Sequence, residues 1–357
     1  MLYSTKYEEN VQEEVIQLRL YAIERGDGWS SVYKAFPNIP KSSIKDIFYR
    51  WEREQRTGNI GEFPEPIIIG DSFAEEEIDE EEVWRAALAL SEKRKKVIQK
   101  KKNHQIIFEE GPVAIVFIAD PHLGGRGVDY KRLDSDVTEI LSTPAMYVCT
   151  VGDMVDNFII GKLKDIRLGT PFTVSEEWAL AKRVLRLLAP RMILSVSGNH
   201  DLWTYALTNI DYLSEIHQQL NPHILYAKYD HNVTITVGET SLDLRLRHQW
   251  RGSSIYNETH GIERAAKFDK GEHFDIGVGA HTHVSGLYRQ FNNGGKTGHA
   301  IICGSYKFDD DFASKNGFSK PNEAAAVGVI IWPDGTVLGS NSLSAISSYM
   351  RIIYSST

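Results

Sequence analysis

The chain has 357 residues, enough for one large domain and a smaller one. Hydrophobic residues make up 42% and charged residues 25%, which is typical of a folded globular protein and excludes a disordered, collagen-like or disulfide-stapled chain. The net charge of −8 excludes a protein that coats nucleic acid nonspecifically, so any contact with nucleic acid has to be local or assisted by bound cations.

The N-terminal sequence and the cysteines indicate the compartment. The first residues are polar and acidic, unlike a signal peptide, and no apolar run approaches the roughly 20 residues of a membrane span. Only Cys149 and Cys303 could pair, which is too few for a disulfide framework. We expect a cytosolic protein without a membrane partner, with homo-oligomers left open. Its general character favours a phage or mobile-element enzyme of a bacterial cytosol, although no single residue carries that assignment.

Residues 1–57 show the apolar spacing of three short helices. Apolar positions from Val11 onward predict the first helix, residues 29–36 predict the second, and Ser42 and Ser43 can cap the third. A tight turn before the last of three helices is the outline of a helix-turn-helix unit. The third helix has a slight basic excess, but the whole segment is nearly charge-balanced. Docking to DNA or RNA and a role in packing or assembly are therefore both open.

Residues 58–104 are predicted to be an acidic linker followed by a charged helix. Prolines and an acidic run from Glu75 to Glu82 mark the linker. A helix over residues 81–102 would be acidic at its start and basic at its end, which suits the helix dipole. The basic end could alternatively serve as an arm that faces phosphates.

From about residue 105 the pattern changes to short apolar runs that end in polar clusters. Residues 113–118, 146–151 and 192–196 have the length and composition of buried strands, and a helix is predicted over residues 175–188. Buried strands that alternate with helices indicate an α/β fold. The carboxyl ends of such strands are where the sheet places its site.

The rest of the chain returns to the sheets. Residues 299–303 and 326–332 are further apolar runs that we expect to complete a two-sheet sandwich. The long polar and aromatic loop between them, residues 304–322, is predicted to lie near the mouth of the site. We place this last and largest domain at residues 105–357.

The predicted strand ends gather carboxylates, histidines and one amide. Oxygen and imidazole ligands without thiolate favour Mn, with Fe, Zn or Ni as alternatives, over a structural zinc cage. Seven candidate ligands are too many for one ion and suit two divalent ions, roughly 3.5–4 Å apart, that share a carboxylate. The candidates are Asp120, His122, Asp153, Asn199, His248, His281 and His283.

This constellation resembles the calcineurin-like metallophosphoesterase superfamily. Five signature blocks follow one another in the order of that family across roughly residues 113 to 285. Each block alone is weakly specific, but five in order form a strong signal. The blocks read Asp120-Pro-His122, Gly152-Asp153-Met-Val-Asp156, Gly198-Asn199-His200-Asp201, a lone His248, and Gly279-Ala-His281-Thr-His283.

The resemblance implies a fold and a distribution of the ligands over two metals. The fold would be a four-layer α/β/β/α sandwich, preceded here by the small helical domain. Three residues would hold each metal, and one carboxylate would bridge the two. The first metal would be held by Asp120, His122 and His283, the second by Asn199, His248 and His281, and Asp153 would be the bridge.

The resemblance also implies the chemistry. A hydroxide that bridges the two metals would attack phosphorus in line. His200 would face the scissile phosphate and protonate or stabilise the leaving oxygen. Asp201 would orient His200 by a hydrogen bond.

Two blocks depart from the family pattern. Arg247 stands before His248 where glycine is usual, and Ala280 is inserted before His281. His248 is therefore the least secure ligand, and His260 is its rival. For Asp156, support of His122 and simple capping of the following turn are both open.

The resemblance leaves the substrate open, because the superfamily includes phosphoprotein phosphatases, nucleotide phosphodiesterases and DNA nucleases. The helical segment and the GDxxD and GNHD blocks, which are similar to those of double-strand-break repair nucleases, favour a Mn-dependent phosphodiesterase or nuclease acting on DNA. No capping domain of that nuclease family is visible. The alternative is a small-molecule or phosphoprotein phosphatase that uses its N-terminal helices for assembly. A noncatalytic binding protein is disfavoured, because His200 and all the candidate ligands are present.

Overall fold

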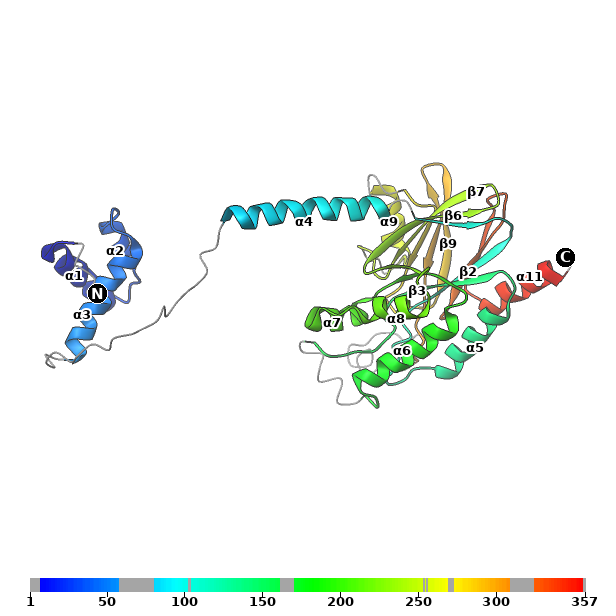
Figure 1. Ribbon diagram of the computed structural model, residues 1–357, viewed down its shortest axis with the longest axis horizontal. Coiled ribbons are helices and arrows are strands. Elements are labelled where there is room, and N and C mark those ends of the chain that lie inside the picture. Colours follow the sequence, from blue (N-terminus) through cyan, green and yellow to red (C-terminus); the bar gives the residue numbers. More distant parts are fainter. Residues whose placement is uncertain are drawn as a thin grey trace. The chain divides into compact units, whose positions relative to one another are not determined.

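The computed structural model describes most of the chain (Figure 1). Its contacts divide the chain into two compact units, Met1–Asp79 and Glu80–Thr357. The predicted linker before residue 80 and most of the predicted loop, from residue 309, lie outside the described residues. Within the described part, no helix is both long and apolar enough to cross a membrane. The described residues are 7–57, 80–101, 104–160, 170–252, 254, 256–268, 273–308 and 324–355.

The first unit contains three helices where the sequence predicts them. They are α1 (Glu9–Glu24), α2 (Ser30–Ala35) and α3 (Lys41–Thr57). A small apolar core joins them, and its buried members are Val15, Ala22, Val32, Ile44 and Ile47. Whether this unit docks to nucleic acid stays a prediction.

The second unit begins with α4 (Glu80–Lys101) and continues into two six-stranded sheets. In the first sheet β2, β3, β4 and β5 run parallel to one another, and β11 pairs antiparallel with β2. Because parallel neighbours end at the same edge, the polar residues after β2, β3 and β4 are brought together. The strands in order are β12 (Val337–Ser340), β11 (Val327–Ile331), β2 (Val113–Ile118), β3 (Met146–Val151), β4 (Met192–Val196) and β5 (Leu225–Ala227).

The second sheet is mixed and adds two further strand ends to the site. Its strands β7 and β8 run parallel to each other, so the residues after them also share one edge. The strands in order are β1 (Gln105–Phe108), β6 (Asp230–Val237), β7 (Thr240–Arg247), β8 (Ile276–Gly279), β10 (Lys296–Ile302) and β9 (Leu287–Asn293).

Helices cover the outer faces of both sheets. Four helices pack with the first sheet in one apolar cluster, and α9 packs against the outer face of the second sheet in another. The layers are therefore helix, sheet, sheet and helix, as the sequence predicts. The helices are α5 (Tyr130–Ser142), α6 (Val174–Leu188), α7 (Asn199–Thr208), α8 (Tyr212–Leu220), α9 (His260–Phe268) and α11 (Leu343–Ser355), of which α5, α6, α8 and α11 cover the first sheet.

Strand β2 shows why these strands are apolar at every position. Its six residues are all buried, because alternate side chains enter two different apolar clusters. A strand buried on both faces has a continuous apolar run instead of an alternating one. The side chains toward the helices are Ala114, Val116 and Ile118, and those toward the second sheet are Val113, Ile115 and Phe117.

A buried polar relay links the first sheet to α8. The Thr150 hydroxyl donates to Ser195 Oγ at 2.7 Å, and Ser195 Oγ lies 2.9 Å from His217 Nε2. Because Ser195 Oγ accepts the hydrogen bond from Thr150, its own hydroxyl proton is free to be donated to His217. His217 Nε2 then carries no proton and acts as the acceptor. Burial lowers the pKa of His217 to about 4 from 6.5, against a small opposing effect of Asp211.

The lowered pKa of His217 predicts a loss of stability in acid. Between pH 6.5 and pH 4 the unfolded chain binds a proton at this position that the folded chain does not, so the free energy of unfolding falls as the pH falls. When the pH is lowered from about 7 to about 5, we expect the free energy of unfolding to fall by about 2 kcal/mol more in the unmodified protein than in His217→Gln. Urea unfolding at the two pH values measures both losses. Equal losses for both proteins would contradict this role of His217.

Candidate metal centre

Three strands of the first sheet deliver polar residues to one place. Asp120 and His122 follow β2, Asp153 follows β3, and Asn199 and His200 begin α7 after β4. Backbone hydrogen bonds join these loops, since Asp120 N–H donates to the Gly152 carbonyl at 3.1 Å and His122 N–H to the Asp153 carbonyl at 3.1 Å. The candidate ligands are thus fixed to the sheet edge by their own main chain.

The second sheet supplies the remaining imidazoles. His248 directly follows β7, and His281 and His283 follow β8. The His281 N–H donates to Asp120 Oδ2 at 2.9 Å, which connects the ends of the two sheets. His248 Nδ1–H donates to the Val151 carbonyl at 2.7 Å, so its Nε2 is directed into the site.

The backbone at the candidate ligands has an uncommon conformation. Asp120, His122, Asp153, His281 and His283 have φ angles of 49°, 44°, 51°, 77° and 50°. Side chains other than glycine rarely adopt this left-handed region, which costs of the order of 1–3 kcal/mol per residue. Eight non-glycine residues of the described chain have positive φ, and five of them are candidate ligands. Strain concentrated in this way is typical of a functional site.

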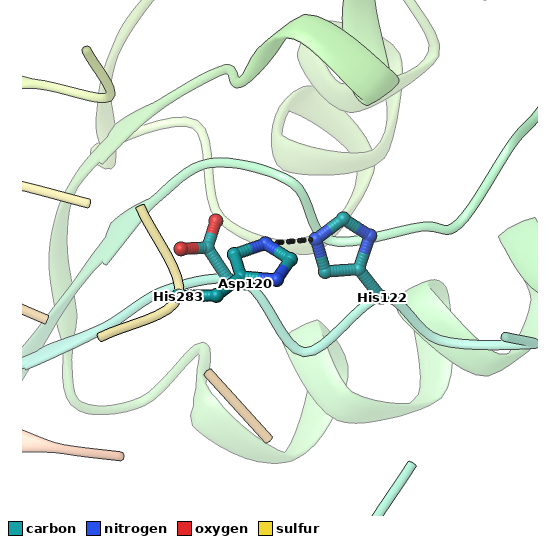
Figure 2. Close-up of side chains that lie close together, drawn as sticks. All are labelled: Asp120, His122 and His283. Atoms are coloured by element: carbon teal, nitrogen blue, oxygen red, sulfur yellow. Dashed lines mark hydrogen bonds between the residues drawn. The ribbon is translucent and has the colours of Figure 1, made fainter. Parts of the chain in front are cut away.

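The first group of ligand atoms combines one carboxylate and two imidazoles. Asp120, His122 and His283 offer atoms within 4.8 Å of one another. His122 Nε2 lies 2.9 Å from His283 Nε2, and Figure 2 shows the two rings meeting beside the Asp120 carboxylate. Such convergence of imidazole nitrogens is what a shared cation requires.

The second group lies around Asp153. Asp153, His248 and His281 also offer atoms within 4.8 Å of one another. Asp153 Oδ2 lies 3.1 Å from His248 Nε2 and 3.9 Å from His122 Nε2, so the same oxygen faces both groups. The resemblance implies that Asp153 bridges two metals; its position is compatible with this role, which stays a prediction.

Two buried oxygens in this site have no hydrogen-bond partner among the described residues. They are Asp120 Oδ1 and Asn199 Oδ1. Burying an oxygen without a partner costs free energy, whereas two divalent cations, one at each atom, would supply the missing partners. The donor set, oxygen and imidazole without thiolate, therefore fits the pair of divalent ions, and that these residues bind them stays a prediction.

Burial and neighbouring charges set the protonation of these groups. Burial, followed by the neighbouring His200 and His283, holds the pKa of His122 well below its usual range, so its ring is neutral and able to bind a cation. Burial, assisted by Asp153, raises the pKa of Asp120 to about 8. For His248 burial alone would lower the pKa, but Asp153 and Asp120 raise it to about 10. The proton on His248 thus supplies positive charge that a metal would replace.

One predicted contact is wrong. Asp201 does not hydrogen-bond the His200 ring; its carboxylate accepts from the main-chain N–H groups of Met154 and Gly198, both at 2.9 Å. The reason is helical geometry, because adjacent residues in a helix such as α7 point in different directions. His200 Nδ1–H instead donates to the Asp156 carbonyl.

Asp156 supports the histidines of the site. Its carboxylate Oδ1 lies 3.3 Å from His122 Nδ1, and its carbonyl accepts from His200. Of the two roles left open by the sequence, the position of the carboxylate beside the ring favours support of His122, although His122 Nδ1 makes no hydrogen bond to it. His260, the rival of His248, is the first residue of α9 and belongs to none of the metal-ligand groups found among the described residues.

The sequence did not identify Lys307 as part of this site. Its side chain is 3% exposed, and Nζ donates to Asp156 Oδ1 at 2.7 Å. Two residues earlier, Ser305 Oγ donates to the Asp120 carbonyl at 2.8 Å. The predicted loop does reach the site, but a lysine in a polar loop is usually exposed, so no sequence signal marked this residue as buried.

The family comparison agrees with this geometry. Residues 113–285 match the family model described as calcineurin-like phosphoesterase. No curated protein matches the chain. Similar solved structures include Vps29 of Chaetomium thermophilum, with 12% identity over 64% of this chain and 93% of that chain and a TM-score of 0.30. They also include TT1561 of Thermus thermophilus, with 11% identity over 65% of this chain and 99% of that chain and a TM-score of 0.37. The nuclease MPE of Pseudomonas putida has 12% identity over 63% of this chain and 87% of that chain and a TM-score of 0.29.

Replacing His248 is expected to remove one metal ion. His248→Ala takes away an imidazole beside Asp153, so we expect bound Mn to fall from about two ions per chain to about one after dialysis, as measured by inductively coupled plasma mass spectrometry. His260→Ala is the matched control and should keep both ions. Equal losses in the two variants, or none in His248→Ala, would exclude His248 as a ligand.

Removing the Lys307 charge is expected to destabilise the fold. Lys307→Met leaves the Asp156 carboxylate buried without its cationic partner, which costs roughly 3–5 kcal/mol for pairs of this kind. Urea unfolding measures the loss. The double variant Lys307→Met with Asp156→Asn should recover part of it, because the uncompensated charge is then absent. A Lys307→Met protein as stable as the unmodified one would show that the pair contributes nothing.

Proposed function

Residues 113–285 of this chain belong to the calcineurin-like phosphoesterase family, and from that premise we propose that the protein is a Mn-dependent phosphodiesterase that cleaves DNA. The placement of His200 carries the proposal. Its side chain is 11% exposed, and Nε2 lies 4.0 Å from Asp153 Oδ2, the oxygen that faces both ligand groups. A proton donor is thus held next to the position of the two cations.

The main chain fixes which nitrogen of His200 acts. A carbonyl can only accept, so the contact with the Asp156 carbonyl places a proton on Nδ1. Nε2 is then the nitrogen that faces the substrate. In the imidazolium form, with a proton on each nitrogen, Nε2 would give its proton to the leaving oxygen when the P–O bond breaks, and the ring would be left as the neutral imidazole with its proton on Nδ1. Trp203, whose ring centroid lies 4.0 Å from that of His200, restricts the orientation of the imidazole.

The metal ligands complete the chemistry. Asp120, His122 and His283 would hold one divalent ion, Asn199, His248 and His281 the other, and Asp153 would join them. When bound, the ions would polarise the phosphoryl oxygens and lower the pKa of a water molecule that serves as nucleophile. The oxygen and imidazole donors support Mn as the metal, with Fe, Zn or Ni as alternatives.

The helices of the first unit support DNA as the substrate. On α3, Lys41, Lys45 and Tyr49 are exposed and lie four residues apart, so they share one face of the helix. Two ammonium groups beside a phenol suit contact with a phosphate backbone. The rival proposal is a phosphatase for small molecules or phosphoproteins, in which this face serves assembly.

The two cysteines bear on the cellular location. Cys149 and Cys303 are both free and buried in the layer between the sheets. Burial raises the pKa of both thiols, which keeps them protonated and unreactive. Reduced, buried cysteines are consistent with the reducing cytosol, where we infer that the enzyme acts.

Removing the His200 imidazole is the direct test of the chemistry. We expect His200→Ala to reduce turnover of bis-p-nitrophenyl phosphate and of DNA by roughly 10²- to 10⁴-fold in Mn-loaded protein, with both metal ions retained. His223→Ala, which removes an exposed histidine, is the matched control. Turnover of p-nitrophenyl phosphate without cleavage of any diester would favour the phosphatase.

The same assays test the role of the helices. The double variant Lys41→Glu with Lys45→Glu should raise the KM for DNA several-fold, weaken its salt dependence, and affect bis-p-nitrophenyl phosphate much less. Identical kinetics on DNA for the variant and the unmodified protein would exclude this face of α3 from substrate binding.

A further inference from the structure

A cavity of about 640 Å³ adjoins the candidate metal centre. Its lining includes His281 and Thr282, which lie at the metal centre, as well as Arg247, Trp250 and Arg251. The volume is within the range of sites that bind small molecules. Because His281 belongs to both, a substrate bound at the metal centre can extend directly into this cavity.

Arg247 is the distinctive residue of the cavity. It is the last residue of β7, immediately before His248, and its Nε is buried without a hydrogen-bond partner among the described residues. Its guanidinium carbon lies 5.5 Å from the centroid of the Trp250 ring. A cationic donor held against an aromatic face and lacking an acceptor is suited to bind an anion from outside.

Arg245, on the same strand, is an arginine that is paired with a carboxylate. It is 4% exposed, and its Nη2 and Nε donate to the Asp230 carboxylate at 2.9 and 3.2 Å. No such carboxylate contact is found for Arg247 within the described chain. Arg251, exposed at the rim, adds a second positive charge, and Glu258 is the acidic residue of the lining.

The wall behind Arg247 is rigid. Trp250 Nε1 donates to the Val278 carbonyl at 2.8 Å, and its ring packs against Phe274 with centroids 5.4 Å apart. Gly279 leaves room for this ring, because a Cβ there would lie 2.6 Å from Trp250 Cδ1. The guanidinium of Arg247 therefore rests on a side chain that the second sheet itself positions.

We infer that this cavity binds the phosphate next to the scissile one in a nucleic-acid strand, with Arg247 as its principal ligand and Arg251 as its second. A guanidinium presents two parallel N–H donors to phosphate oxygens, and charge-assisted bonds of this kind are among the strongest in proteins. The inference rests on the proposed function, since it assigns the substrate class of the same site. It makes Arg247 a residue that selects polynucleotides over isolated phosphoesters.

Dinucleotides with and without a terminal phosphate test the subsite. TpT contains one diester phosphate, whereas pTpT and TpTp each carry a second phosphate on one side of it. Binding is measured by calorimetry with Mn-loaded His200→Ala protein, in which turnover of the ligand is expected to be roughly 10²- to 10⁴-fold slower. We expect one of the two phosphorylated ligands to bind roughly 10- to 100-fold more tightly than TpT.

Variants of Arg247 in this background give the decisive comparison. Arg247→Met should reduce the ratio of the affinities for the phosphorylated dinucleotide and TpT to near one. Arg247→Lys should keep part of this preference because the charge remains. Arg183→Met, which replaces an exposed arginine on α6, should leave the preference unchanged. A preference that survives Arg247→Met, or equal affinity of the parent for all three ligands, would overturn the subsite. Absence of diester hydrolysis by the unmodified protein would instead count against the proposed function, because the binding comparison needs no turnover.

Discussion

The Asp153 carboxylate imposes the constraint on which the site depends. It is 1% exposed, its Oδ1 accepts from the His200 N–H at 2.8 Å, and its Oδ2 faces His248, His122 and His200 at 3.1, 3.9 and 4.0 Å. A buried anion needs nearby positive charge. In the metal-free chain a proton on His248 can supply it, and two divalent ions would supply it more fully. The chain therefore folds around an anion whose charge bound divalent ions would neutralise.

The fold meets this constraint with two sheets instead of one. The first sheet provides the carboxylates and the proton donor His200, and the second sheet provides His248, His281 and His283. Apolar side chains fill the space between the sheets, so the strand ends keep their spacing without help from the loops. Five of the candidate ligands have a left-handed backbone conformation, and the packing between the sheets has to compensate for the free-energy cost of that strain.

Features that depend on the local sequence pattern could be predicted. Strands β2, β3 and β4 begin and end where their apolar runs do, because a strand buried on both faces has an unbroken apolar run. Six of the predicted ligands lie in groups that could hold a metal ion. Contacts between distant segments could not be predicted, and Lys307 pairs with Asp156 across 151 positions. The resemblance implies a hydrogen bond from Asp201 to the His200 ring, but the Asp201 carboxylate accepts from the main-chain N–H groups of Met154 and Gly198 instead.

Anomalous X-ray scattering at the manganese edge, from crystals of the full chain grown with Mn²⁺, tests whether two metal ions bind at this site. We expect two peaks on either side of the Asp153 carboxylate, one among Asp120, His122 and His283 and the other among Asn199, His248 and His281. A single peak away from Asp153, or no peak at these side chains, would contradict a dimetal site and with it the proposed chemistry.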